Sequence, residues 1–172
     1  MATSTPLDER AAPEPREAVL DTVAAQADAI DKILELAQQR LCVFDVDLSQ
    51  TGWNTVRRAE RLGAFLRRHR NARVEIILHE TRWLEAACPR LRALQKLHAG
   101  AITIYRTGTE ARHAMDPLLI ADGRHFLHRF HIDHPRAALA IEMPALARPL
   151  VMRFDEIWAT GEPGLNASVL GL

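Results

Sequence analysis

The chain has 172 residues and a mass of 19.3 kDa, which fits one domain of ordinary size with a tail. Hydrophobic residues make up 48% of the sequence and charged residues 26%, which excludes collagen-like, fully disordered and disulfide-scaffold proteins. No uncharged apolar run approaches the roughly 20 residues that a membrane helix needs, and no secretory signal is visible. These features predict a cytoplasmic protein that does not bind a membrane.

The charges balance overall but are unevenly distributed along the chain. The totals are 22 basic and 22 acidic residues, and residues 41–172 hold eighteen of the basic and fourteen of the acidic ones. This mild excess of basic over acidic residues does not require a nucleic-acid partner, because nucleic-acid-binding domains usually have a pI above about 9. The two cysteines, Cys42 and Cys88, are expected to stay reduced and buried.

Hydrophobic periodicity predicts alternating helices and strands. Residues 1–16 contain three prolines and few large apolar residues, which predicts a flexible tail. Residues 17–40 show helical spacing, which predicts a long amphipathic N-terminal helix. The next predicted elements are strands at 41–48, 72–79 and 101–107, with helices at 55–70 and 80–100 between them.

The last third of the chain is predicted to form a hairpin and a closing helix. Asp122-Gly123 lies between two apolar runs in residues 117–130, which is a strong two-residue turn signal. Residues 135–160 return to helical spacing, interrupted by prolines, and residues 162–172 are expected to form a tail. The predicted fold is an α/β domain over residues 41–161, with a mixed, mostly parallel sheet flanked by helices.

The predicted core follows the apolar positions of the strands and of the last helix. Twelve residues are expected to be buried: Val43, Phe44, Val46, Ile76, Ile77, Leu78, Ile102, Ile104, Leu119, Ile120, Phe154 and Trp158.

Common catalytic and cofactor motifs are absent from the sequence. There is no GxxxxGK[ST] or GxGxxG loop to cradle phosphates, no GxSxG elbow, and neither CxxC nor HExxH. No cofactor and no metal site are therefore predicted. A pair of carboxylates, Asp45 and Asp47, ends the first strand at the edge where α/β sites usually form.

Five of the eight histidines lie between His113 and His134. If the strand runs on past residue 130, alternation places His125, Arg129, His131 and Asp133 on one face. This segment has three open interpretations: a metal site, an anion or ligand site, and structural or exposed histidines. A metal site requires three or four ligands at about 2 Å from one ion, and three-residue spacing does not place neighbours on one strand face.

Residues 57–73 form a second unusual segment, because seven arginines there surround a single acid, Glu60. Such a basic helix could follow a phosphate backbone, or it could be the solvated face opposite an apolar stripe. The arginines are Arg57, Arg58, Arg61, Arg67, Arg68, Arg70 and Arg73.

The C-terminal part of the chain resembles one half of the phospholipase D superfamily. The resemblance is specific over LLIADGRHFLHRFHIDHPRAALAIEMPALARPLVMRFDEIW, and the alternation of strands and helices extends it to residues 41–160. In that family an HxKxxxxD signature ends in a strand and turn. A second strand and a helix follow, and Phe154, Asp155 and Trp158 resemble the end of that helix.

The resemblance implies that the catalytic pair is missing from this chain. If Asp122 is the aspartate of the signature, the histidine position falls on Met115 and the lysine position on Pro117. In the family the histidine is the nucleophile and the lysine stabilises phosphate charge. The family also needs two such motifs, and this chain has room for one. The resemblance therefore implies a silent half-domain, similar to an uncharacterised bacterial group.

Three functions follow from these observations. The first is a non-catalytic binding or interaction module, which by resemblance could pair as a two-fold homodimer or bind a protein partner. The second is a phosphodiesterase or nuclease with a rebuilt site. The third is a nucleic-acid-binding domain that uses the arginines of residues 57–73. The candidate phosphate- or ligand-binding residues are His113, Asp122, His125, Arg129, His131 and Asp133.

Overall fold

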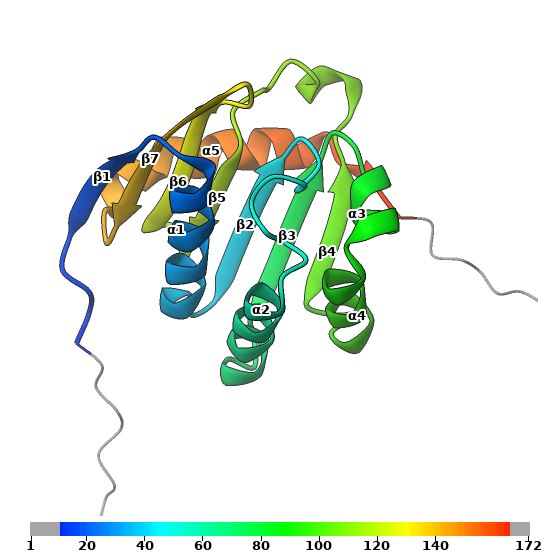
Figure 1. The fold of residues 1–172 in the computed structure, drawn as a ribbon, viewed down its shortest axis with the longest axis horizontal. Coiled ribbons are helices and arrows are strands. Elements are labelled where there is room, and N and C mark those ends of the chain that lie inside the picture. Colours follow the sequence, from blue (N-terminus) through cyan, green and yellow to red (C-terminus); the bar gives the residue numbers. More distant parts are fainter. Residues whose placement is uncertain (1–10, 166–172) are drawn as a thin grey trace, which may run out of the picture.

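The computed structural model describes residues 11–165, which form one sheet of eight strands with helices on both faces (Figure 1). The predicted tails lie partly outside the described residues, at 1–10 and 166–172. The strands are β1 (Arg16–Leu20), β2 (Arg40–Asp45), β3 (Arg73–Leu78), β4 (Ile102–Arg106), β5 (Leu118–Ala121), β6 (His125–His131), β7 (His134–Ile141) and β8 (Glu162–Pro163).

The strand order is β1-β7-β6-β5-β2-β3-β4-β8, and the sheet is mixed, as predicted. The expectation of a mostly parallel sheet is wrong. Only β2 with β3 and β3 with β4 are parallel, and the other five pairings are antiparallel. The reason is that short turns join β5, β6 and β7, and a short connection can join only antiparallel strands.

The last helix crosses one face of the sheet, and the other helices cover the opposite face (Figure 1). The helices are α1 (Val23–Leu36), α2 (Val56–Arg68), α3 (Arg82–Ala87), α4 (Pro89–Leu97) and α5 (Pro144–Ala159), with a short 3₁₀ turn, η1 (Thr109–Ala111). Threonine caps start two of them: Thr22 Oγ1 accepts from Ala25 N–H at 3.1 Å, and Thr55 Oγ1 accepts from Arg58 N–H at 3.2 Å. Pro89 divides the predicted helix 80–100 into α3 and α4, which confirms the predicted break.

Two segments that were predicted to be helical are strands. Residues 16–20 form β1, which pairs antiparallel with β7, so the N-terminal helix starts at Val23 and not at residue 17. Residues 134–141 form β7, and α5 begins only at Pro144. Over five to eight residues the helical and extended patterns overlap, and tertiary pairing at the sheet edge decides between them.

The sheet separates two hydrophobic clusters, one beneath α1 to α4 and one beneath α5. Ten of the twelve residues predicted to form the core are buried, and the other two, Val46 and Trp158, are half-buried. Trp158 stacks on Tyr105 with ring centroids 4.5 Å apart. Val46 follows the end of β2, where the chain leaves the sheet. Within residues 11–165 no helix has both the length and the apolar character to cross a membrane.

The predicted hairpin turn is confirmed at Asp122-Gly123. Asp122 has a φ of 55° and Gly123 a φ of 64°. Positive φ at two successive positions is the geometry of a type I′ hairpin turn, which favours Asp or Asn followed by Gly. The turn joins β5 to β6 beside the first residue of β2, because Asp122 N–H donates to the carbonyl oxygen of Arg40 at 2.9 Å.

Candidate functional site

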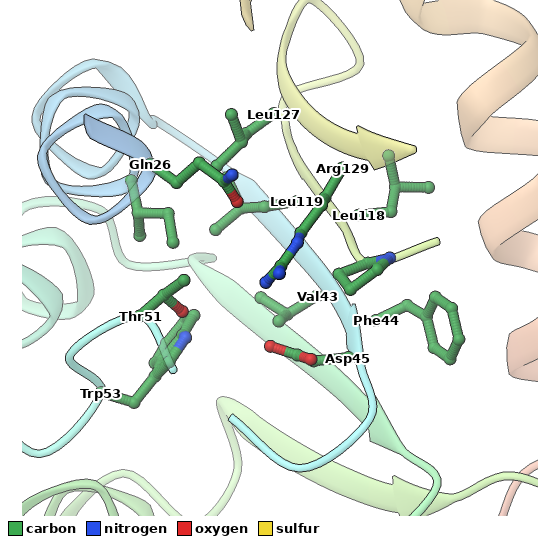
Figure 2. Close-up of a pocket in the computed structure, with 12 residues that line it drawn as sticks. Gln26, Val43, Phe44, Asp45, Thr51, Trp53, Leu118, Leu119, Leu127 and Arg129 are labelled. Atoms are coloured by element: carbon green, nitrogen blue, oxygen red, sulfur yellow. The ribbon is translucent and has the colours of Figure 1, made fainter. Parts of the chain in front are cut away.

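A small cavity with a mostly apolar lining and a few polar side chains lies at the carboxyl end of β2, where the strand enters the loop of residues 46–55 (Figure 2). Its volume is about 30 Å³. This gives room for one or two water molecules, and not for a nucleotide or a lipid headgroup. The polar lining residues are Gln26, Asp45, Thr51 and Arg129, and the apolar ones include Val43, Trp53, Pro117, Leu119 and Leu127.

Arg129, on β6, occupies the centre of this site. Figure 2 shows its guanidinium group pointing into the cavity toward Asp45. Each of its three nitrogens donates to a protein oxygen: Nε to the carbonyl of His134 at 2.7 Å, Nη1 to Gln50 Oε1 at 2.5 Å, and Nη2 to the carbonyl of Ile132 at 2.6 Å. The side chain therefore uses three of its five N–H groups to tie the β6–β7 turn to the loop after β2.

Asp45 ends β2 and is the acidic member of the site. Burial raises the pKa of its carboxyl group to about 6, against the opposing effects of the Val46 backbone N–H and of the Arg129 charge. The Val46 N–H donates to Asp45 Oδ1 at 2.6 Å. Asp47, two residues on, does not join the cavity, because its carboxylate accepts from the N–H and hydroxyl groups of Ser49.

Two cavity residues gave no signal in the sequence. Gln26, on α1, donates through Nε2 to the carbonyl of Pro135 at 2.7 Å, and it is 1% exposed. Thr51 is also buried, and its Oγ1 has no hydrogen-bond partner among residues 11–165. Both are ordinary polar residues far along the chain from Arg129, so only the tertiary structure brings them together.

One of the predicted family positions, the lysine position, lies at this cavity. Pro117 lines the cavity. Its carbonyl oxygen accepts from the Arg129 N–H at 2.9 Å, and the carbonyl of Met115 accepts from the Ile132 N–H at 2.7 Å. The segment therefore continues the β5–β6 ladder beyond Leu118. It presents a half-buried thioether at residue 115 and a pyrrolidine ring at residue 117.

Asp122 lies at the opposite end of β2 from the cavity. Its carboxylate accepts backbone N–H groups of three successive residues: Gln38 at 2.8 Å, Gln39 at 2.8 Å and Arg40 at 2.9 Å. These bonds fix the connection from α1 into β2. The Asp122 carboxylate therefore has a structural role, because it accepts hydrogen bonds from backbone N–H groups at the start of β2.

His125 lies beside Asp122, and its side chain is 3% exposed. Its Nδ1 accepts from the Glu142 N–H at 2.9 Å, and burial lowers the pKa of its imidazole below the ordinary value of 6.5. Four residues of extended strand separate it from Arg129, a distance of roughly 13 Å. Asp122 and His125 therefore cannot share one phosphate with Arg129.

The remaining candidates lie near the β6–β7 turn or in the loop before β5. His131 Nδ1 accepts from the Asp133 N–H at 3.2 Å, so these two residues lie next to the carbonyl groups that hold Arg129. His113 follows η1 and is exposed. Among residues 11–165 there is no group of three or more His, Cys, Asp or Glu side chains placed to hold a metal ion.

A second polar cluster lies on the α5 face of the sheet. Asp116 accepts from His128 Nε2 at 2.8 Å, from Arg153 Nε at 2.8 Å, and from Arg153 Nη2. Burial raises the pKa of the Asp116 carboxyl group, but the hydrogen bonds from His128 and Arg153 and the charge of Arg153 outweigh burial and lower this pKa to about 2. The cluster anchors α5 to the start of β5.

The arginines of residues 57–73 divide into two groups. Three of them face α1 and pair with its acids, at Asp28, Asp31 and Glu35. The most buried of these pairs joins Arg58 Nε to Asp31 Oδ1 at 2.7 Å. The other four, Arg67, Arg68, Arg70 and Arg73, are exposed.

Comparison with solved structures assigns the fold. The archaeal chromatin protein TrmBL2, whose structure "shows a novel mode of DNA binding", matches with a TM-score of 0.61 and 18% identity over 86% of this chain. The chain spans only about half of that protein, 54% of its length. Nuc from Salmonella typhimurium, a phospholipase D family member, matches with a TM-score of 0.59 and 15% identity over 87% of this chain and 97% of its own.

A third neighbour, NucT from Helicobacter pylori, matches with a TM-score of 0.56 and 9% identity, over 87% of this chain and 99% of its own. The fold is therefore that of a phospholipase D half-domain, as the resemblance implied. The chain belongs to the family described as "Domain of unknown function (DUF7931)", whose model matches residues 22–169. No curated protein matches the chain.

Proposed function

We propose that this protein is a non-catalytic binding module built on a phospholipase D half-domain. The observation that carries the proposal is that all three guanidinium nitrogens of Arg129 donate hydrogen bonds to protein oxygens. The cavity that holds this group has a volume of only about 30 Å³. The family resemblance places the nucleophilic histidine at Met115 and the lysine at Pro117. Neither side chain can attack phosphorus or stabilise phosphate charge.

The geometry does not favour the alternative of a rebuilt phosphate site. Such a site would need the candidate residues to converge on one point. His125 and Asp122 lie at one end of β6, Arg129 lies at the other, and each is engaged by backbone groups. His113 is exposed in a separate loop.

A hydrolysis assay tests the proposal. The purified protein is incubated with bis(p-nitrophenyl) phosphate, single- and double-stranded DNA, RNA and phosphatidylcholine vesicles, with and without Mg²⁺ and Mn²⁺. An active nuclease serves as the positive control. We expect no turnover above the blank. Hydrolysis that is lost in His125→Ala or His131→Ala would overturn the proposal, and hydrolysis that persists unchanged in both variants indicates a contaminating enzyme.

The proposal includes a partner and a location. Because the neighbour TrmBL2 binds DNA, nucleic acid is a candidate partner class for this module. A homodimer is a second candidate, and light scattering of the purified protein over a concentration series tests it. A cytoplasmic location fits the two cysteines, Cys42 and Cys88, which are both buried and free.

A further inference from the structure

We infer that this protein binds the phosphate backbone of nucleic acid through an arginine edge formed by Arg67, Arg68, Arg70 and Arg73. This inference rests on the proposed function, since it names the partner of the binding module. The edge lies where α2 ends and β3 begins, at the amino ends of the parallel strands. The cavity with Asp45 lies at the carboxyl end of β2, five residues or roughly 17 Å away.

Ion pairing distinguishes the arginine edge from the rest of the arginine-rich segment. Arg57 and Arg58 pair with Asp31 at 3.3 and 2.7 Å, and Arg61 pairs with Glu35 at 2.6 Å, so their charges are largely neutralised. In contrast, no carboxylate of residues 11–165 lies within 4.0 Å of the four arginines of the edge. Arg68 Nη2 donates to the carbonyl oxygen of Leu34 at 3.5 Å, so a phosphate can bind the four arginines without displacing a carboxylate.

The arginine edge is held by regular structure. Arg67 and Arg68 lie in the last turn of α2, and Arg73 is the first residue of β3. The short connection between them is closed by hydrogen bonds from the Ala72 N–H to the carbonyl of His69 at 3.0 Å and from the Arg73 N–H to the carbonyl of Gln39 at 2.8 Å. Only the side chains must lose freedom on binding, which keeps the entropic cost of a phosphate contact low.

The nearby groups reinforce the positive charge. Lys96, exposed in the last turn of α4, adds a fifth cation on a helix that packs against α2. Glu75 lies on the same strand as Arg73, but Arg40 Nε holds its carboxylate at 2.5 Å. Glu60 lies about two turns before Arg67 on α2, roughly 10 Å along the helix axis.

The chemistry of the edge favours nucleic acid over a membrane surface. All four members are arginines, whose planar fork matches two phosphate oxygens, and they lie between the last turn of α2 and the first residue of β3. Membrane-binding surfaces insert large apolar side chains between lipid headgroups, and none is exposed within residues 67–73 itself. The exposed Val56 and Leu97 line a groove between α2 and α4 that Arg67 borders, so anionic vesicles are included in the test.

The test is the salt dependence of binding to a short fluorescein-labelled DNA duplex, followed by fluorescence anisotropy. Four phosphate contacts predict a slope of log K against log salt of about −3 to −4. Between about 50 and 200 mM KCl the affinity then falls on the order of 100-fold. The quadruple variant Arg67→Gln, Arg68→Gln, Arg70→Gln, Arg73→Gln is expected to lose this binding.

Two further variants separate binding from stability. The pair Arg70→Gln, Arg73→Gln lies outside α2, so it leaves the helix end unchanged and should reduce the slope by about two. The matched control replaces four exposed arginines that have acidic partners: Arg106, Arg112, Arg124 and Arg136, each changed to Gln. This control removes the same formal charge and should retain most of the affinity.

Three outcomes overturn the inference. The protein does not bind the duplex at low salt, or the quadruple variant and the control lose the same affinity for the duplex. In the third outcome, the protein binds vesicles that contain anionic lipid and does not bind DNA. Failure of this inference and failure of the proposed function give different results. If the protein neither binds DNA nor hydrolyses any substrate, only the inference about the arginine edge is rejected. If it hydrolyses a substrate, the non-catalytic proposal is rejected, and the arginine variants still test DNA binding.

Discussion

Asp122 and Arg40 exchange two hydrogen bonds across the start of β2. The Arg40 N–H donates to Asp122 Oδ1 at 2.9 Å, and the Asp122 N–H donates to the carbonyl oxygen of Arg40 at 2.9 Å. Asp122 also accepts from Gln38 and Gln39, so it closes the connection from α1 while forming the hairpin turn. This role gives a structural reason for an aspartate at this position, whether or not any catalysis occurs.

Replacement of Asp122 tests this structural role. Asp122→Ala leaves three backbone N–H groups without their acceptor and places alanine at a φ of 55°, so the free energy of unfolding should fall by about 2–4 kcal/mol. Asp122→Asn keeps one acceptor oxygen and tolerates positive φ, so its loss should be about half as large. Urea denaturation measures both. Equal stability of Asp122→Ala and the wild type would contradict the interpretation.

Arg129 is expected to stabilise the protein by joining the β6–β7 turn to the loop after β2. Arg129→Met removes three hydrogen bonds and leaves buried Asp45 without its nearby cation, so the free energy of unfolding should fall by about 3–5 kcal/mol. Because Arg129 and Asp45 interact, Arg129→Met should lower the free energy of unfolding less in an Asp45→Asn background than in the wild type. An equal effect of Arg129→Met in both backgrounds would show that the two groups are uncoupled.

Asp45 should make the protein less stable as the pH rises. The pKa of its carboxyl group is about 6 in the folded protein and 3.8 in the unfolded chain. Between these values the unfolded chain releases a proton that the folded protein retains, so stability declines from about pH 4 to pH 6 and then levels off. Asp45→Asn removes this decline. It should raise the free energy of unfolding by about 3 kcal/mol at pH 7.5 and leave it unchanged near pH 3. Thermal melts across this range give the comparison.

Asp116 should have the opposite effect at lower pH. The pKa of its carboxyl group is about 2 when folded, below the ordinary 3.8, so its contribution is complete above about pH 4 and is lost as the pH falls toward 2. Asp116→Asn should therefore lower stability by about 2 kcal/mol at pH 7 and make little difference near pH 2. A variant that is equally destabilised at both pH values would point to packing rather than charge.

Much of the fold follows from local sequence patterns. The strands β2, β3 and β4, the helix α2, the break at Pro89 and the turn at Asp122-Gly123 were all predictable, because period, capping residues and turn residues act over a few positions. Local patterns failed for β1 and β7. Both are short segments in which the helical and extended patterns coincide, and each is a strand because the other lies beside it.

The composition of the site could not be predicted in the same way. Arg129 and Asp45 were visible in the sequence as a basic residue among histidines and an acid at a strand end. Their meeting, and the roles of Gln26 and Thr51, depend on contacts between distant segments. The sequence by itself determined the alternating elements, and its resemblance to the phospholipase D superfamily predicts that Met115 and Pro117 replace the His and Lys of the signature. Only the tertiary structure decided that Asp122 and His125 lie away from Arg129, because strand register and turn position determine which side chains converge.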